Sequence, residues 1–214
     1  MFEDRKDAGR RLARALDKYR DSRPLILAIP RGGVEVGYQV AKHLKADFSL
    51  LVSRKLPLPN NPEAGFGAIS ENGSTYLVPG ATSWLSTGDI LRIKEAQSQE
   101  VKRRIKALRQ GKSLPEISGR TVILVDDGLA MGSTMKAALM FCRNKKAAKI
   151  VVAVPVSGRD TASHMSKIAD DLVVLETPPY FRAVAQVYEN WHDVTDEEVI
   201  RIMSKWRKRA SKQE

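Results

Sequence analysis

The chain has 214 residues, with 36 Lys and Arg against 25 Asp and Glu, so its formal net charge is +11. This length suits one domain with a sizeable core, and apolar residues spread along the whole chain exclude a disordered tail protein. A single cysteine, Cys142, excludes an internal disulfide, and no uncharged apolar stretch is long enough to cross a membrane. Charges where a signal peptide needs apolar residues lead us to expect a cytoplasmic protein.

The first elements alternate between helix and strand. Apolar residues at helical spacing predict a helix over residues 5–19. The apolar run 25–29 predicts a strand, which is followed by a Pro-Arg-Gly-Gly turn at 30–33 and a helix over 34–44. A second short strand is expected at 48–52.

Two segments interrupt this alternation. Residues 56–80 are rich in Pro, Asn and Gly, and we expect a long loop there with a small hairpin, whose arms are 68–71 and 75–78. Residues 85–110 are expected to form a long helix with one apolar side and one heavily charged side.

The second half of the chain returns to buried strands, expected at 121–125, 150–154 and 172–175, with a helix over 132–144. Short apolar runs between helices are typical of a parallel sheet covered on both faces. We therefore predict a single α/β domain, 1–214, on a mainly parallel five-stranded sheet with helices on both faces. Its expected parts are a core at about 22–175, an inserted loop and helix at about 56–112, and a C-terminal hood and helix at about 176–212.

One stretch combines a buried strand, two acids and a glycine turn. The strand 121–125 ends at Asp126 and Asp127, and residues 128–134 then open a helix. Open α/β sheets bind ligands at the carboxyl ends of their strands, and a glycine turn at a helix N-terminus offers N–H groups to a phosphate. The carboxylates would then contact hydroxyl groups or Mg²⁺ nearby. A sugar phosphate satisfies both halves of this site.

The acidic pair could also serve a different role. An Asp-Asp pair after a strand can be a helix cap with a solvated charge beside it. The acidic pocket of a receiver domain would follow the first strand and needs partners that we do not find. A nucleotide P-loop is not favoured, because the spacing is short and no lysine precedes Ser133 and Thr134.

The run VILVDDGLAMGST, residues 122–134, resembles the phosphoribosyl pyrophosphate (PRPP) signature of the type I phosphoribosyltransferases. Together with the turn at 30–33, an Arg-Lys pair at 54–55 and the FxAVxQxY segment at 181–188, it is similar to bacterial and archaeal proteins known only as predicted phosphoribosyltransferases. The resemblance covers about residues 5–186 and implies the type I phosphoribosyltransferase fold.

The resemblance implies an enzyme of nucleotide metabolism that transfers the 5-phosphoribosyl group of PRPP to a nitrogenous base or small amine and releases pyrophosphate. Catalysis would fall to Asp126, Asp127, Arg54 and Lys55, with the two acids binding the ribose hydroxyls directly or through Mg²⁺ carried with PRPP. A mobile catalytic loop at about 56–66 would close over the substrate and exclude water.

The resemblance also assigns the binding residues. The 5′-phosphate would be held by Gly128, Leu129, Ala130, Met131, Gly132, Ser133 and Thr134. The pyrophosphate would be held by Arg31, Gly32 and Gly33, with Lys55 beside it. Purine salvage members of the family carry an aspartate at the position of Ala130, so a hypoxanthine or guanine enzyme is less expected. The family commonly has a threonine at the position of Met131, so phosphate binding would here depend on backbone N–H groups, Ser133 and Thr134.

The acceptor would be recognised by the hood at residues 176–191. Its aromatic residues Tyr180 and Phe181 could stack on a planar base. The spacing of the apolar residues at 180–188 equally fits a helix packed on the edge of the sheet. Cys142 is expected to be core packing, and the three histidines form no metal-ligand spacing.

The excess positive charge leaves a second functional class open. Basic clusters at 5–23, 102–112, 143–149 and 201–212 suggest, as an alternative, a non-catalytic PRPP- or nucleotide-sensing regulator or a nucleic-acid-binding protein on the same fold. Asp and Glu are interleaved with these clusters, so a solvated surface is favoured and no specific nucleic acid is expected. Apolar residues in 85–108 and 196–206 suggest a homodimer.

Overall fold

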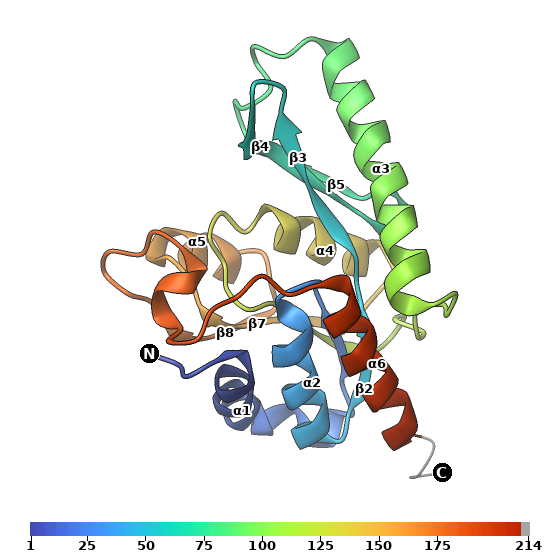
Figure 1. Cartoon of the computed structure of the whole chain (residues 1–214), viewed down its shortest axis with the longest axis vertical. Coiled ribbons are helices and arrows are strands. Elements are labelled where there is room, and N and C mark those ends of the chain that lie inside the picture. The colour runs from blue at the N-terminus through green and yellow to red at the C-terminus, as the bar shows by residue number, and fades with distance from the viewer. Residues whose placement is uncertain (211–214) are drawn as a thin grey trace.

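A five-stranded parallel sheet forms the centre of the computed structural model, which describes residues 1–210 (Figure 1). The strands run in the order β2-β1-β6-β7-β8, and every neighbouring pair is parallel. They are β1 Leu25–Ala28, β2 Asp47–Leu50, β6 Thr121–Val125, β7 Lys149–Val156 and β8 Asp171–Glu176. The predicted fold class is confirmed.

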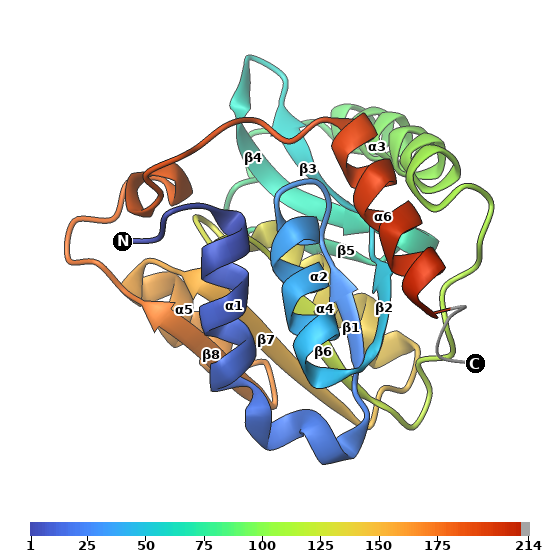
Figure 2. The same ribbon diagram turned by 60° about the horizontal axis from the view of Figure 1, so that its bottom comes forward.

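Helices cover both faces of this sheet, because successive strand residues point to opposite faces and both sets are apolar. Ile26 and Ile123 point into one core and Leu27 and Leu124 into the other. On the first face lie α1 Arg5–Ala15, α2 Gly33–Leu44 and α6 Asp196–Ala210, seen in front of the sheet in Figure 2. On the second lie α4 Ser133–Asn144 and α5 Arg159–Ser166. The expected first helix ends early and continues as the 3-10 helix η1 Asp17–Ser22.

A second, antiparallel sheet projects from the first together with the long helix α3 Thr87–Arg109 (Figure 1). We call this three-stranded sheet the flap; it consists of β3 Ser53–Leu58, β4 Asn61–Ser70 and β5 Thr75–Leu77. The hairpin expected around residues 68–78 is present as β4 and β5, joined by the 3-10 helix η2 Glu71–Gly73. The expected loop before it is wrong, since most of 56–66 is paired strand.

Packing against α3 explains this correction. Leu56 and Phe66 of the flap are fully buried beside Ile93 and Val101 of the helix. Pro57 lies at a shift in the β3–β4 register, where a missing N–H is tolerated. The turn-forming residues therefore suggested a loop, whereas contacts to a distant helix produce a sheet.

The base of the flap is fixed by a buried ion pair. Glu71 accepts hydrogen bonds from the backbone N–H of Val52 and from Nη2 of Arg109, each at 2.9 Å. Burial raises the pKa of Glu71, although Arg109 opposes this effect. A second contact joins the flap to α4, where Nζ of Lys136 donates to Oη of Tyr76 at 3.2 Å. The flap is thus held at its base by both α3 and α4.

The segment between β8 and α6 contains less helix than the apolar spacing of residues 180–188 suggested. Residues 177–195, which join β8 to α6 and contain most of the expected hood, form one short 3-10 helix, η3 Val184–Val187. The helix expected over 180–188 is therefore wrong, whereas the packing expected of its apolar residues is present, since Val187 and Tyr188 are buried beside Val156 of β7. We keep the name hood for residues 177–195. Helix α6 follows the hood. The last two residues of the expected hood and helix segment, 211 and 212, lie outside the described residues. Within residues 1–210, no helix combines the length and apolar character needed to cross a bilayer.

Most of the apolar residues on which the homodimer prediction rests are buried within the chain itself. Ile93, Val101 and Leu108 of α3 are buried, as are Val199 and Met203 of α6. Trp84 and Leu91 are exposed beside the flap. The homodimer stays a prediction that size-exclusion chromatography can test.

Replacing Arg109 with Met should lower the free energy of unfolding by about 3–5 kcal/mol, because Glu71 would stay buried without its partner. Urea unfolding measures this loss, and the double variant Glu71→Leu/Arg109→Met should recover part of it. The control Arg92→Met removes an exposed pair with Asp89 and should cost less than about 1 kcal/mol. Equal losses in both single variants would contradict the role of the buried pair.

Candidate active site

The topology of the large sheet creates a crevice between β1 and β6. The chain leaves β1 through α2 toward β2 on one side, and leaves β6 through α4 toward β7 on the other. Neighbouring parallel strands whose connections diverge leave a ligand crevice at their carboxyl ends. The turn 29–32 and the turn 126–132 therefore lie side by side, and each opens a helix. The sequence placed both predicted binding turns correctly at strand ends.

Backbone and carboxylates approach closely in this crevice. A Cβ atom added to Gly32 would overlap Oδ2 of Asp127, and one added to Gly33 would lie 2.8 Å from the carbonyl oxygen of Val125. Glycine is therefore required at both positions for steric reasons. The peptide bond between Pro30 and Arg31 is cis.

The two acids differ in their surroundings. Oδ1 of Asp126 accepts a hydrogen bond from the backbone N–H of Asp127 at 2.9 Å. Burial, together with the neighbouring charge of Asp127, raises the pKa of Asp126 well above its ordinary value. Asp127 is 14% exposed at its side chain and accepts a hydrogen bond at Oδ2 from Nε of Arg5 at 2.8 Å. The carboxyl group of Asp126 thus resists ionisation, whereas that of Asp127 is held by the cation of Arg5.

The residues of the expected phosphate loop, 128–134, all line one cavity of about 280 Å³. The loop is fixed from behind, since the backbone N–H of Leu129 donates to Val156 and Oγ1 of Thr161 donates to the carbonyl of Ala130. Within residues 1–210, every α-helix except α4 carries an acid in its first turn, and no side chain caps α4. Its free N–H groups and positive end therefore favour an anion in the cavity.

Lys55 and Arg54 separate on the two sides of β3. Lys55 lines the cavity opposite the phosphate loop, and its aliphatic part lies against Gly65 of the flap. Arg54 instead donates from Nε to Oε1 of Gln97 in α3 at 3.2 Å. Burial and the charge of Arg104 lower its pKa. The structure thus brings Lys55 to the site, whereas the side chain of Arg54 is engaged by α3.

Arg31 lies at the rim of the crevice, where its Nη1 is 3.6 Å from Oδ1 of Asp196 at the start of α6. This oxygen is buried and has no hydrogen-bond partner among the described residues. Arg31 is partly exposed, so an anion bound at the turn can compete with Asp196 for its guanidinium group.

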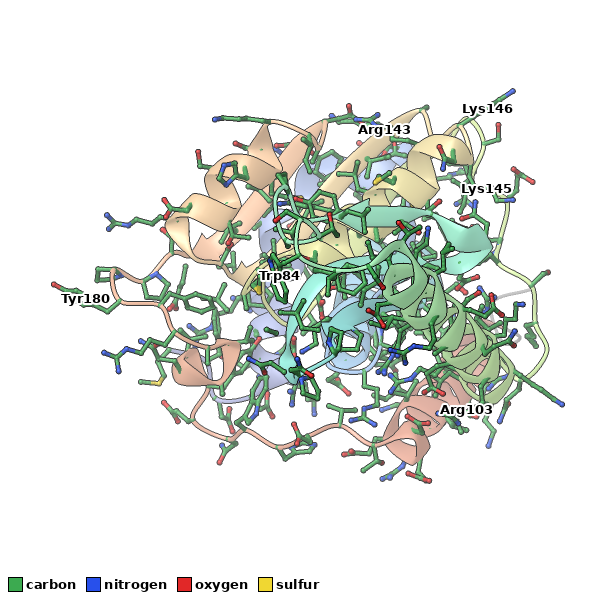
Figure 3. All side chains as sticks on the ribbon, turned by 90° about the horizontal axis from the view of Figure 1, so that it is seen from above. Trp84, Arg103, Arg143, Lys145, Lys146 and Tyr180 are labelled. Atoms are coloured by element: carbon green, nitrogen blue, oxygen red, sulfur yellow. The ribbon has the colours of Figure 1, made fainter. Side chains whose placement is uncertain are left out.

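The two aromatic residues of the hood do not line the cavity. Tyr180 is 83% exposed and projects away from the molecule in Figure 3. Phe181 packs against Gly158 after β7. Val184 takes the place next to the phosphate loop, where its methyl groups cover Gly128. The expected stacking by Tyr180 and Phe181 stays a prediction.

Sequence reasoning missed Arg5, Tyr188 and Val184. Arg5 shares a helix face with Ala8 and Leu12, three and seven residues on, and is itself buried. A charged residue in an apolar helical stripe was the signal that could have revealed it. Tyr188 donates from its hydroxyl to the backbone carbonyl of Asp127 at 2.7 Å. Cys142 is buried in the core, as expected.

The phosphoribosyl transferase domain family matches residues 2–190 of this chain. The chain belongs to this family. Two relatives in Mycobacterium tuberculosis, named "Putative phosphoribosyl transferase Rv0571c" (strain H37Rv) and "Putative phosphoribosyl transferase MT0597" (strain CDC 1551), are each 38% identical to it over 207 residues. The match covers 96% of this chain, and the chain spans about half the length of these relatives (47%).

A solved structure, that of TT1426 from Thermus thermophilus, is similar with a TM-score of 0.82 and 35% identity, covering 96% of this chain and 99% of that one. This phosphoribosyl transferase domain thus has a solved counterpart of nearly the same extent. The family implied by the motif at 122–134 is confirmed.

Gly32→Ala should destabilise this phosphoribosyl transferase domain by about 1–3 kcal/mol, because the new methyl group displaces Asp127 or the turn. The control is Gly88→Ala in α3, where the nearest atom to an added Cβ is 3.7 Å away. That variant should be unchanged or gain less than about 1 kcal/mol. Thermal unfolding of both variants checks the prediction, and a Gly32→Ala protein as stable as the wild type would contradict it.

Cys142 should resist thiol reagents in the folded protein. Burial raises its pKa to about 12, so the reactive thiolate is rare at about pH 8. We expect one thiol to react with an aromatic disulfide reagent after denaturation and almost none before it. Rapid reaction of the native protein would show that this part of α4 opens readily.

Proposed function

We propose that this protein transfers the 5-phosphoribosyl group of PRPP to a nitrogenous base or small amine and releases pyrophosphate. The observation that carries the proposal is the cavity that joins the phosphate loop to Lys55, beside the acidic pair and the Arg31 turn. One end offers helix N–H groups and the other a cation, which suits a ligand with a phosphate at each end.

Each group has a distinct part in the proposed reaction. The N–H groups at the start of α4, at the end of loop 128–134, hold the 5′-phosphate together with the hydroxyls of Ser133 and Thr134. Asp127 accepts hydrogen bonds from the ribose hydroxyls and orients the ring. As the bond from C1 to the diphosphate breaks, the negative charge on the leaving group rises, and Lys55 and Arg31 stabilise it electrostatically. The acceptor nitrogen forms its bond to C1 as the bond to the diphosphate breaks, and the proton that it loses leaves to solvent.

The residues present fit a magnesium ion carried by the substrate better than one held by the protein alone. No group of three or more His, Cys, Asp or Glu side chains within residues 1–210 could hold a metal. Asp127 has one carboxylate oxygen bonded to Arg5, which leaves Oδ1, while Asp126 resists ionisation. Mg²⁺ commonly takes one or two carboxylates and several phosphate oxygens. When bound with PRPP, it would neutralise part of the diphosphate charge.

The peripheral basic charge supports the enzyme over a nucleic-acid-binding protein. Many of the basic residues at the periphery form ion pairs with acidic residues of the same surface, as in Arg103–Glu100, Arg104–Glu100 and Arg143–Asp170. Figure 3 shows Arg143 and Lys145 on one side of the molecule and the exposed hood residue Tyr180 on the other. A surface of paired charges attracts a polyanion weakly.

Calorimetric titration with PRPP and Mg²⁺ tests the proposed ligand. Lys55→Met should weaken binding about 10- to 100-fold, because a charge-assisted contact is lost from the cavity. Lys106→Met, an exposed lysine of α3, serves as the matched control and should bind normally. A folded wild-type protein that does not bind PRPP with Mg²⁺ would overturn the proposal.

Pyrophosphate release from PRPP with a panel of bases and amines tests the reaction itself. Turnover with one acceptor, abolished by Asp127→Asn, is the expected result. Binding of PRPP without turnover of any acceptor would favour a sensing regulator on the same fold. Binding of RNA or DNA that persists at physiological salt would favour the nucleic-acid alternative instead.

A further inference from the structure

Arg5 lies outside both ligand-binding turns and yet contacts the carboxylate proposed to bind ribose. Its side chain is 7% exposed, which is unusual for arginine unless its charge is paired. Nε donates to Oδ2 of Asp127 at 2.8 Å, and Nη1 donates to the backbone carbonyl of His192 at 2.9 Å. The guanidinium carbon lies 3.9 Å from the centre of the Trp191 ring. Arg5 is thus held from three directions.

These contacts determine which oxygen of Asp127 is available. Oδ2 is bonded to Arg5, whereas Oδ1 accepts no hydrogen bond from a cation or a backbone N–H within residues 1–210; both oxygens lie beside Gly32. Rotation of this carboxylate about its Cβ–Cγ bond would break the hydrogen bond to Arg5. The remaining oxygen is therefore presented in one orientation, ready to accept from a hydroxyl group.

The same contacts join Asp127 to the hood. The backbone of Phe2 exchanges hydrogen bonds with Val187 and Glu189, at 2.7 and 2.9 Å, so the segment before α1 is paired with the hood. Tyr188, next to this pairing, donates to the backbone carbonyl of Asp127. Main chain and side chain of Asp127 are thus each held by a residue from this N-terminal and hood assembly.

We propose that Arg5 is a positioning residue for ribose recognition, which fixes one oxygen of Asp127 so that the other accepts from the ribose hydroxyls, and which links this carboxylate to the hood. The assignment rests on the proposed function. It predicts that Arg5 governs discrimination between ribose and deoxyribose, a property that general stability does not control.

The test compares two sugar phosphates. Wild-type protein should bind ribose 5-phosphate more tightly than 2-deoxyribose 5-phosphate, in calorimetric titrations that also include PRPP with Mg²⁺ and inorganic phosphate. Arg5→Met should weaken PRPP binding about tenfold and bring the two sugar phosphates within about twofold of each other. Its affinity for inorganic phosphate, which needs the loop 128–134 alone, should change less than about twofold.

Two further variants separate positioning from folding. Arg10→Met removes an exposed arginine of the same helix, paired with Asp7 at 3.5 Å, and should keep the wild-type preference. Arg5→Lys retains the charge but cannot reach Asp127 and the His192 carbonyl together, so it should fold and lose part of the preference. Should Arg5→Met fail to fold, Arg5→Lys decides the question.

The outcomes distinguish the two proposals. If wild-type protein does not bind PRPP, the proposed function fails and the assignment of Arg5 fails with it. If wild-type protein binds PRPP and prefers ribose, while a folded Arg5→Met or Arg5→Lys variant keeps that full preference, the assignment of Arg5 alone is overturned. A loss of affinity equal for all ligands, inorganic phosphate included, would show a merely structural role and overturn it too.

Discussion

The close approach of two backbone turns at the β1–β6 crevice is the constraint on which the rest of the site depends. Gly32 and Gly33 leave no room for a side chain beside Asp127 and Asp126. This proximity follows from the parallel pairing of β1 with β6 and from connections that leave the two strands in opposite directions. The start of α2 and the carboxyl groups of Asp126 and Asp127 therefore lie against each other at this edge of the sheet, which is the arrangement on which the proposed sugar-phosphate site is built.

Local pattern was enough to predict the large sheet and the two glycine turns that follow β1 and β6. The strands are short apolar runs, and the turn 128–134 follows its strand directly, so neither needs information from distant residues. The flap could not be predicted in this way. Leu56 and Phe66 become strand residues because Ile93 and Val101 pack against them from a helix about thirty residues further along the chain. Pro57 and the surrounding glycines, taken alone, favour a loop.

The side chains of the site were harder to predict than its backbone. Adjacent residues in a strand face opposite ways, so Arg54 and Lys55 could not both reach the cavity, and the sequence does not say which one does. The hood is a largely irregular segment whose residues are placed by contacts to the N-terminus and to β7, and spacing carries no information about those. Arg5 is the exception, because its position in an apolar stripe was visible in the sequence.

The two contacts at the base of the flap limit how the flap can move relative to the large sheet. Glu71 is bonded to Arg109 and Tyr76 to Lys136, so the end of the flap nearest the large sheet is fastened to two helices. Rotation of the whole flap would break both fastenings at once, whereas bending the hairpin between Leu58 and Asn61 breaks neither. Lys55 lies on the fastened side of that bend. A bend at the hairpin tip would therefore leave Lys55 in its place in the wall of the cavity.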